Sequence, residues 1–139
     1  MSNSTLETIG VLAFDHLTLV VQDLERSRRF YVDVLGMRQV ERPAFSFAGL
    51  WFQLGSNQIH LILEHDQSGP AGSPPPPGHA SAGRTLHFAF EVADAHRALE
   101  QLQRLEVPIR SGPKLRPDGC TQIWCYDPDG HIVELFSRP

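Results

Sequence analysis

The sequence predicts an α+β domain made of two βαβββ modules. Two observations support this architecture. Strand-like and helix-like segments follow the order strand, helix, three strands, and this order occurs twice. A segment that cannot pack separates the two repeats. We expect each module to form a curved mixed sheet with its helix on one face.

Length and composition exclude several classes of protein. A chain of 139 residues with 41% hydrophobic residues supports one real core but leaves little room for two independent domains. The formal net charge of −4 offers no basic surface for nucleic acid. No apolar run approaches the ~18 residues needed to cross a bilayer. The first ten residues contain no basic leader or apolar signal core, so we expect a cytoplasmic protein.

A stretch rich in Pro, Gly and Ser divides the chain. It covers residues 67–83, lacks periodic apolar residues and predicts an exposed linker. We expect the other segments to be an N-terminal arm, a first module and a second module, at residues 1–12, 13–66 and 84–138. Apart from the N-terminal arm, we expect the chain to form a single domain over residues 13–139.

The first module begins with a half-buried strand. Residues 14–21 alternate between apolar and polar side chains. Asp23 can cap a helix that ends at Gly36, because its carboxylate accepts from free N–H groups and glycine tolerates a left-handed conformation. Three strand-like runs follow, at residues 37–42, 45–54 and 57–65.

The second module repeats this order. Residues 85–92 alternate like a strand, and Asp94 can cap the following helix. A short strand is expected near Ile109. Two further strand-like runs, at residues 120–127 and 131–136, are joined by a turn of the sequence Asp-Pro-Asp-Gly.

Four polar residues occupy matching places in the two modules. His16 lies seven residues before the cap of its helix, and His87 has the same spacing to its own cap. His60 and Glu134 lie in equivalent later strands. In all four strands the neighbouring aliphatic residues point to the opposite face. If the sheets curve toward each other, the four polar side chains converge on a concave cup.

This set of side chains suits a divalent metal ion. Three neutral imidazoles and one carboxylate are accepted by Ni, Co, Zn, Mn or Fe(II). A buried carboxylate without a cation is costly, and a metal ion removes that cost. We therefore predict one divalent metal ion whose ligands are His16, His60, His87 and Glu134. Coordination positions left free would accept two adjacent oxygens of a small-molecule substrate.

Other residues are candidates for contact with the substrate. Four aromatic residues could form an apolar wall, although each also suits core packing: Phe47, Trp51, Trp124 and Tyr126. Glu64, on the face of His60, is a fifth candidate. Three basic residues near the expected loop mouths could receive an anionic substrate or remain solvated: Arg84, Lys114 and Arg116.

The remaining histidines and the cysteines fall outside this pattern. We expect solvent exposure for four histidines: His65, His79, His96 and His131. Cys120 and Cys125 lie five residues apart in a strand-like run and so point to opposite faces. We therefore expect reduced thiols rather than a disulfide.

Three segments resemble the vicinal oxygen chelate superfamily, which includes glyoxalases, bleomycin resistance proteins and extradiol dioxygenases. They are FDHLTLVVQDLERSRRFYVDVLGM, LHFAFEV and DPDGHIVEL, and the resemblance spans about residues 12 to 138. It implies paired βαβββ modules, a metal ion at the four positions named above, and a homodimer. Whether one chain or two complete the cup stays open.

The resemblance implies a metal-dependent, glyoxalase-like lyase or isomerase acting on a small substrate with vicinal oxygens. Glu134 would be the catalytic group that moves the proton. Lactoylglutathione lyases tend to have Arg and Asn, for the glutathione carboxylates, at the positions of Val20 and Glu64. Glu64 would repel a carboxylate, which argues against glutathione as co-substrate.

Two alternatives follow from the same resemblance. An extradiol-type Fe(II) dioxygenase would use two histidines and one carboxylate, here His16, His87 and Glu134. A drug- or metabolite-binding resistance protein would use the same cup without turnover. Conversion of hemithioacetals or catechols would separate the two enzymes from each other and from a binding protein.

Overall fold

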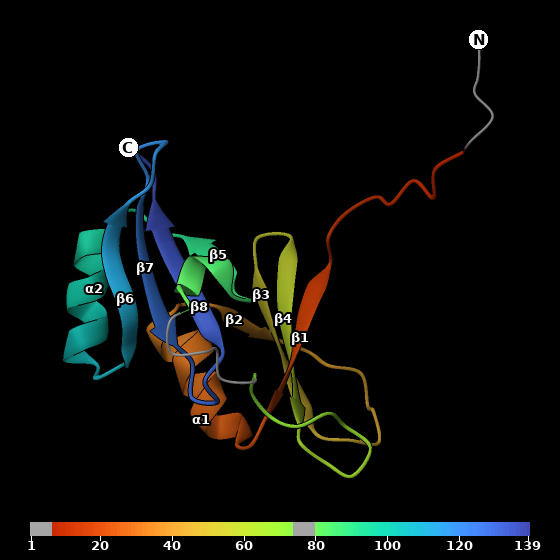
Figure 1. The fold of residues 1–139 in the computed structure, drawn as a ribbon. Coiled ribbons are helices and arrows are strands. Elements are labelled where there is room, and N and C mark those ends of the chain that lie inside the picture. Colours follow the sequence, from red (N-terminus) through yellow and green to blue (C-terminus); the bar gives the residue numbers. More distant parts are fainter. Residues whose placement is uncertain (1–6, 74–79) are drawn as a thin grey trace.

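The computed structural model describes residues 7–73 and 80–139 and contains two four-stranded mixed sheets (Figure 1). In each half of the chain the elements follow the order strand, helical segment, three strands. The predicted α+β architecture of two βαβββ modules is therefore confirmed. His79, which we expected to be solvated, lies outside the described residues.

The first module forms a sheet with the strand order β1-β4-β3-β2. β1 runs parallel to β4, and the other pairs are antiparallel. The helical segment after β1 is a short α-helix, α1 (Leu24–Arg28), that continues as a π-helical turn, η1 (Arg29–Val34). The strands are β1 (His16–Val21), β2 (Arg38–Val40), β3 (Gly49–Leu54) and β4 (Asn57–Leu63).

The second module forms a sheet with the equivalent order β5-β8-β7-β6. β5 runs parallel to β8, and the other pairs are antiparallel. A short 3₁₀ segment, η2 (Ala82–Arg84), precedes the module, and its helix is α2 (Ala95–Arg104). The strands are β5 (Phe88–Glu91), β6 (Ile109–Leu115), β7 (Thr121–Tyr126) and β8 (Ile132–Ser137).

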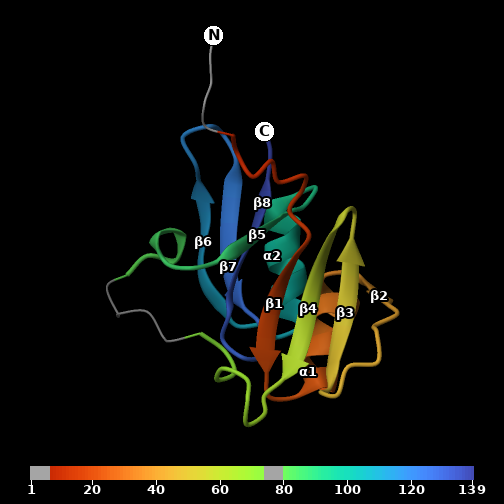
Figure 2. The ribbon, with the colours of Figure 1, turned by 90° about the vertical axis from the view of Figure 1, so that its right-hand side faces the viewer.

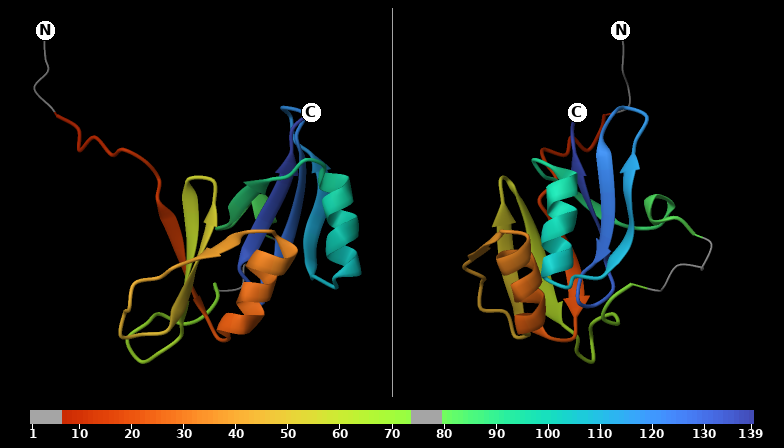
Figure 3. Two further views of the ribbon diagram at one scale, coloured as in Figure 1. Left: turned by 180° about the vertical axis from the view of Figure 1, so that it is seen from behind. Right: turned by 90° about the vertical axis from the view of Figure 1, so that its left-hand side faces the viewer.

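The two sheets lie edge to edge, with both helices on the same side. Figure 3 shows α1 and α2 next to each other in front of the strands, and Figure 2 shows the strands from the opposite side. We call this uncovered side the open face. The adjoining edge strands, β1 and β5, belong to different sheets and share no strand ladder. Within the described ranges, no helix has the length and apolar composition needed to cross a membrane.

Local signals in the sequence account for the helix positions. Asp23 Oδ1 accepts from Arg26 N, and Asp94 Oδ1 accepts from His96 N and Arg97 N. Both carboxylates thus satisfy free N–H groups at a helix start, as predicted. Gly36, after the first helical segment, has a φ of +85°, a conformation that glycine adopts without strain.

A single apolar core joins the modules on the helix side. Leu19, Leu61 and Leu135, from β1, β4 and β8, are buried there together with Ala98 and Leu102 of α2. Both cysteines are free and buried. Burial raises the pKa of the Cys125 thiol to about 12, so this thiol stays protonated at neutral pH.

The turn before β8 holds the two modules together. Asp127 Oδ2 accepts a hydrogen bond of 2.7 Å from the hydroxyl of Tyr31 in η1. Asp129 Oδ1 accepts from Gln22 N, and Asp129 Oδ2 accepts from Ser27 Oγ. Burial, followed by the charge of Asp127, raises the pKa of Tyr31 well above its usual range, so the hydroxyl stays a donor.

The expectation of a solvated His131 is wrong. His131 is only 5% exposed, and its Nδ1 lies 2.7 Å from Asp127 Oδ2. His131 is buried because the Asp127 carboxylate, on the other side of the turn, accepts from His131 N and gives the ring a buried, charged partner. His65 and His96 are exposed, as expected.

An apolar arm precedes β1. Residues 7–15 form no helix or strand, and the arm extends away from the rest of the chain (Figure 1). Ile9, Val11 and Leu12 are 95%, 86% and 99% exposed. Exposed apolar side chains in series are typical of a surface that another molecule covers.

We predict that Tyr31→Phe lowers the free energy of unfolding by about 1–3 kcal/mol, because the buried Asp127 carboxylate loses a donor. Urea denaturation measures this change. Tyr126→Phe is the matched control, since the Tyr126 hydroxyl has no hydrogen-bond partner among the described residues. Equal stability of the two variants would contradict the proposed role of this contact.

Candidate metal centre

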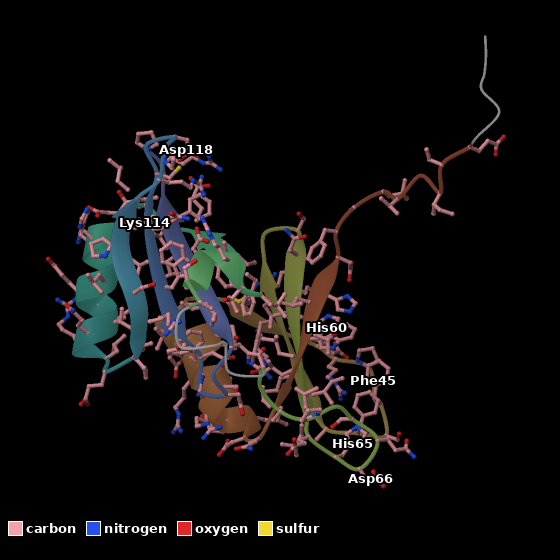
Figure 4. All side chains as sticks on the ribbon, viewed as in Figure 1. Phe45, His60, His65, Asp66, Lys114 and Asp118 are labelled. Atoms are coloured by element: carbon pink, nitrogen blue, oxygen red, sulfur yellow. The ribbon has the colours of Figure 1, made fainter. Side chains whose placement is uncertain are left out.

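The strands place the four predicted ligands on the open face. Glu134 pairs across the ladder with Trp124, and His60 pairs with Trp51, so each pair of side chains shares one face. Figure 4 shows His60 on the side of β1 and β4 that faces away from α1. Val133 and Leu135, the neighbours of Glu134, point to the helix side and are buried in the core.

His16 and His60 form the half-site of the first module. Their rings are stacked with centroids 3.9 Å apart and an interplanar angle of 17°. Trp51 stacks on the other side of His60, with centroids 4.0 Å apart and an angle of 2°. His60 is therefore held between two rings, in a plane nearly parallel to that of His16.

A chain of amide hydrogen bonds fixes the proton on His60. The Gly55 carbonyl can only accept, so Gln53 Nε2 donates to this carbonyl. Gln53 Oε1 is then free to accept from Gln58 Nε2. Gln58 then directs its own Oε1 at His60 Nε2, 2.6 Å away. His60 Nε2 must carry the hydrogen, which leaves the lone pair on Nδ1. Burial first and the charge of His16 second lower the pKa of His60, so the ring is neutral at neutral pH.

His87 and Glu134 form the half-site of the second module. His87 Nε2 lies 3.0 Å from Glu134 Oε1, and His87 Nδ1 lies 2.7 Å from the Thr85 carbonyl. Since a carbonyl only accepts, His87 Nδ1 carries a hydrogen. Gln122 Nε2 donates to Glu134 Oε2 over 3.1 Å. Glu134 is only 4% exposed, so this is a buried carboxylate with a fixed orientation.

This pair fits a cation. In a neutral His87 the Nε2 lone pair would face a carboxylate oxygen. Two acceptors 3.0 Å apart repel each other unless His87 Nε2 is protonated or both atoms bind a cation. Two ligand atoms at ~2.1 Å from one ion and at a right angle to each other are separated by about 3.0 Å. The observed separation of His87 Nε2 and Glu134 Oε1 is therefore the one that two adjacent ligands need.

His16 has the same arrangement as His87. Its Nδ1 lies 2.7 Å from Asp15 Oδ2, so Nδ1 carries the hydrogen and Nε2 keeps its lone pair. Metal-binding histidines usually donate their second nitrogen to a carboxylate or a carbonyl in this way. His16 and His87 therefore each keep the Nε2 lone pair free for a metal ion. His60 differs from them, because Gln58 holds its Nε2 and only its Nδ1 lone pair is free, and both faces of its ring are stacked.

In the structure the four predicted ligands lie in two separate pairs. One pair belongs to each module, and over residues 7–73 and 80–139 no group of three or more His, Cys, Asp or Glu side chains is placed to hold a metal ion. Each chain thus presents two separate pairs of candidate ligands.

The predicted substrate contacts are divided between the open face and loops. Trp51 stacks on His60, and Trp124 lies opposite Glu134. Tyr126 packs beside Trp124 in a small apolar cluster. Phe47, before β3, stacks on His65 with centroids 5.7 Å apart. Glu64 Oε2 accepts from Ala71 N over 2.6 Å and so holds the linker.

Sequence reasoning missed the residues that orient the ligands. Gln58 and Gln122 lie on the same strand faces as His60 and Trp124, two positions earlier in each strand. The same alternation that revealed the histidines could have revealed these amides.

Comparisons with known proteins agree with this fold. The model of the Glyoxalase/Bleomycin resistance protein/Dioxygenase superfamily matches residues 13–135. The chain belongs to this superfamily. A lactoylglutathione lyase from Neisseria meningitidis is 29% identical over 134 residues, covering 88% of each chain. A virulence protein from Salmonella typhimurium is 29% identical over 128 residues, covering 87% of this chain and 81% of that protein.

A solved structure extends the comparison to three dimensions. The crystal structure of a glyoxalase/dioxygenase from Nostoc punctiforme has a TM-score of 0.75 and is 26% identical, with 100% of this chain and 99% of that chain covered. The vicinal oxygen chelate fold expected from the sequence is thus supported along the whole superfamily domain.

We predict different tautomers for these histidines in the metal-free protein. His60 should carry its hydrogen on Nε2, whereas neutral His16 and His87 should carry theirs on Nδ1, because of the acceptors named above. Long-range ¹H–¹⁵N spectra of protein labelled at histidine measure this. A neutral His60 with its hydrogen on Nδ1 would contradict the amide chain, and Gln58→Met should remove the preference at His60 alone.

Proposed function

We propose that the protein is a metal-dependent lyase or isomerase that acts on a small substrate with vicinal oxygens. The observation that carries this proposal is the pair of His87 with the buried Glu134, in which His87 Nδ1 and Glu134 Oε2 each have another hydrogen-bond partner. Relatives named lactoylglutathione lyase support lyase chemistry within the superfamily.

The proposed metal ligands are His16, His87 and Glu134, with His60 as the fourth. His60 would join through Nδ1, the ring nitrogen that Gln58 leaves free. The ion would be Ni, Co, Zn, Mn or Fe(II), all of which accept imidazole and carboxylate ligands. When bound, such an ion supplies Lewis-acid polarisation of a substrate oxygen.

Glu134 is the proposed proton-transfer group. Its Oε2 is held by Gln122, and the Arg116 guanidinium lies 4.0 Å from the same oxygen. Its position on the open face directs the carboxylate toward the substrate side of the sheet. A carboxylate held in one orientation in a buried site can accept a proton from a carbon next to a polarised carbonyl and return it to the neighbouring atom.

The proposed active form is a homodimer. Each chain carries two half-sites, so a second copy that places its His16 and His60 against His87 and Glu134 of the first would complete two sites. Exposed apolar residues precede both half-sites: Phe14 is 68% exposed and Leu86 is 80% exposed. Together with the apolar arm, they offer a surface that a second copy can bury.

One observation favours a second candidate function. His60 differs from the other histidines because its Nε2 is held by Gln58 and its ring is stacked, so the candidates that offer Nε2 or a carboxylate are two histidines and one glutamate. This is the ligand set of non-haem Fe(II) oxygenases. The superfamily includes dioxygenases, so an extradiol-type Fe(II) dioxygenase is the alternative proposal.

We predict that His87→Ala and Glu134→Ala each weaken binding of Ni(II) or Zn(II) by about 100-fold or more, since even partners that only orient ligands contribute 10–100-fold. Isothermal titration and elemental analysis of the full chain measure this. The matched control is His96→Ala, an exposed histidine on α2. Unchanged metal binding in both site variants would contradict the proposed centre.

Turnover then separates the candidate functions. The metal-loaded protein is expected to convert hemithioacetals of 2-oxoaldehydes, and Glu134→Gln should lower kcat while leaving the fold intact. Cleavage of catechols by the Fe(II) form, with metal binding unchanged in His60→Ala, would instead support the dioxygenase. Tight stoichiometric binding of a drug or metabolite without product would reject both enzymes.

A further inference from the structure

A basic cavity adjoins Glu134 on the open face of the second module. Its volume is about 680 Å³, and it lies between the segment around η2 and strands β6 and β7. Among the described residues no acidic side chain lines it, and three cationic side chains do: Arg84, Arg110 and Lys114. Figure 4 shows Lys114 at β6. The protein as a whole has a net charge of −4, so a cavity lined by three positive charges is opposite in sign to the rest of the chain.

The three cations have no carboxylate partner among the described residues. The ion pairs of the second module involve other groups, such as Arg116 with Asp118 and Arg138 with Glu91. Arg110 is held in place by the Ala80 carbonyl, which accepts from its guanidinium over 2.7 Å. Neighbouring cations repel each other in a partly enclosed space, and a bound anion relieves that repulsion.

A lining residue of the same cavity carries an unused donor. Trp124 lines the cavity and is only 4% exposed, yet its indole Nε1 has no hydrogen-bond partner within the described part of the chain. A buried N–H without an acceptor costs about 1–3 kcal/mol. Because Trp124 lines the cavity, its indole N–H lies close enough to sense the charge of an anion bound there.

Gln122 connects the cavity to the proposed metal centre. It lines the cavity, and its Nε2 donates to Glu134 Oε2. Trp124, which also lines the cavity, pairs across the ladder with Glu134 itself. A small molecule that reaches Glu134 with one end can therefore reach the basic cavity with the other.

We propose that this cavity binds an oxyanion group of the substrate, a carboxylate or a phosphoryl group. This proposal rests on the proposed function and narrows its substrate class to anions. Arg84 and Lys114 supply the charge, Arg110 supplies charge and is held in place by the Ala80 carbonyl, and Trp124 forms an apolar wall of the cavity. The oxyanion thereby orients the vicinal oxygens of the same molecule toward His87 and Glu134.

The two indole N–H groups of the chain provide the test. Inorganic phosphate or acetate is titrated into the metal-free full chain at constant ionic strength, and the indole ¹H–¹⁵N signals are followed. The Trp124 signal should shift saturably, whereas that of Trp51, which stacks on His60 in the other module, should not. The probe with the lower Kd distinguishes a phosphoryl from a carboxylate ligand.

Charge-removing variants test the cations. Arg84→Gln and Lys114→Gln should each weaken anion binding by about tenfold, the effect of one charge-assisted hydrogen bond. Arg97→Gln, an exposed change on α2, is the control and should leave Kd unchanged. A Trp124 signal that does not move, or variants that bind the anion as well as the unmodified chain, would overturn the proposal.

The outcome is independent of the metal centre. Anion binding that persists in His87→Ala, together with failure of metal binding in the unmodified chain, would reject the proposed function while the anion cavity remained established. Metal binding and turnover without any anion-dependent shift of Trp124 would reject the cavity and leave the proposed function in place.

Discussion

The site depends on strand alternation against a sheet with one covered face. In β4 and β8 the aliphatic residues point to α1 and α2 and form the core, so each residue between them must face the other way. A histidine or glutamate on the helix side would lose hydration without gaining a partner. The packing that makes the core thus also places His60 and Glu134 on the open face.

The relative position of the modules depends on a second constraint. The carboxylates of Asp127 and Asp129 come from the second module and accept hydrogen bonds from Tyr31, Gln22 and Ser27 of the first. These contacts lie on the helix side of the molecule, while the adjoining strands β1 and β5 share no ladder. The two modules are therefore held together by the turn and the core, while the two pairs of candidate ligands stay apart. The proposed homodimer requires this separation.

The sequence was informative wherever one local rule decides the outcome. Asp23 and Asp94 cap helices because their position before an apolar periodic segment leaves free N–H groups in reach, and the strand faces follow from alternation. The stack of His60 between Trp51 and His16 could not be predicted, because it depends on rotamers set by three strands at once. The exposure of His131 was wrongly predicted for a similar reason. Its partner, Asp127, lies four residues away across a turn, and the sequence does not show how that turn packs. The separation of the half-sites depends on how whole modules dock.

The central claim is that His16 and His60 of one chain meet His87 and Glu134 of another, and a mixed dimer tests it most directly. One variant chain carries His16→Ala and His60→Ala, the other carries His87→Ala and Glu134→Ala, and differently tagged chains allow purification of the mixed dimer. Neither variant alone should bind a metal ion tightly. A site shared between chains predicts one tightly bound ion in the mixed dimer, about half the capacity of the unmodified dimer. A mixed dimer that binds no metal ion, although the unmodified protein does, would show that each site lies within a single chain.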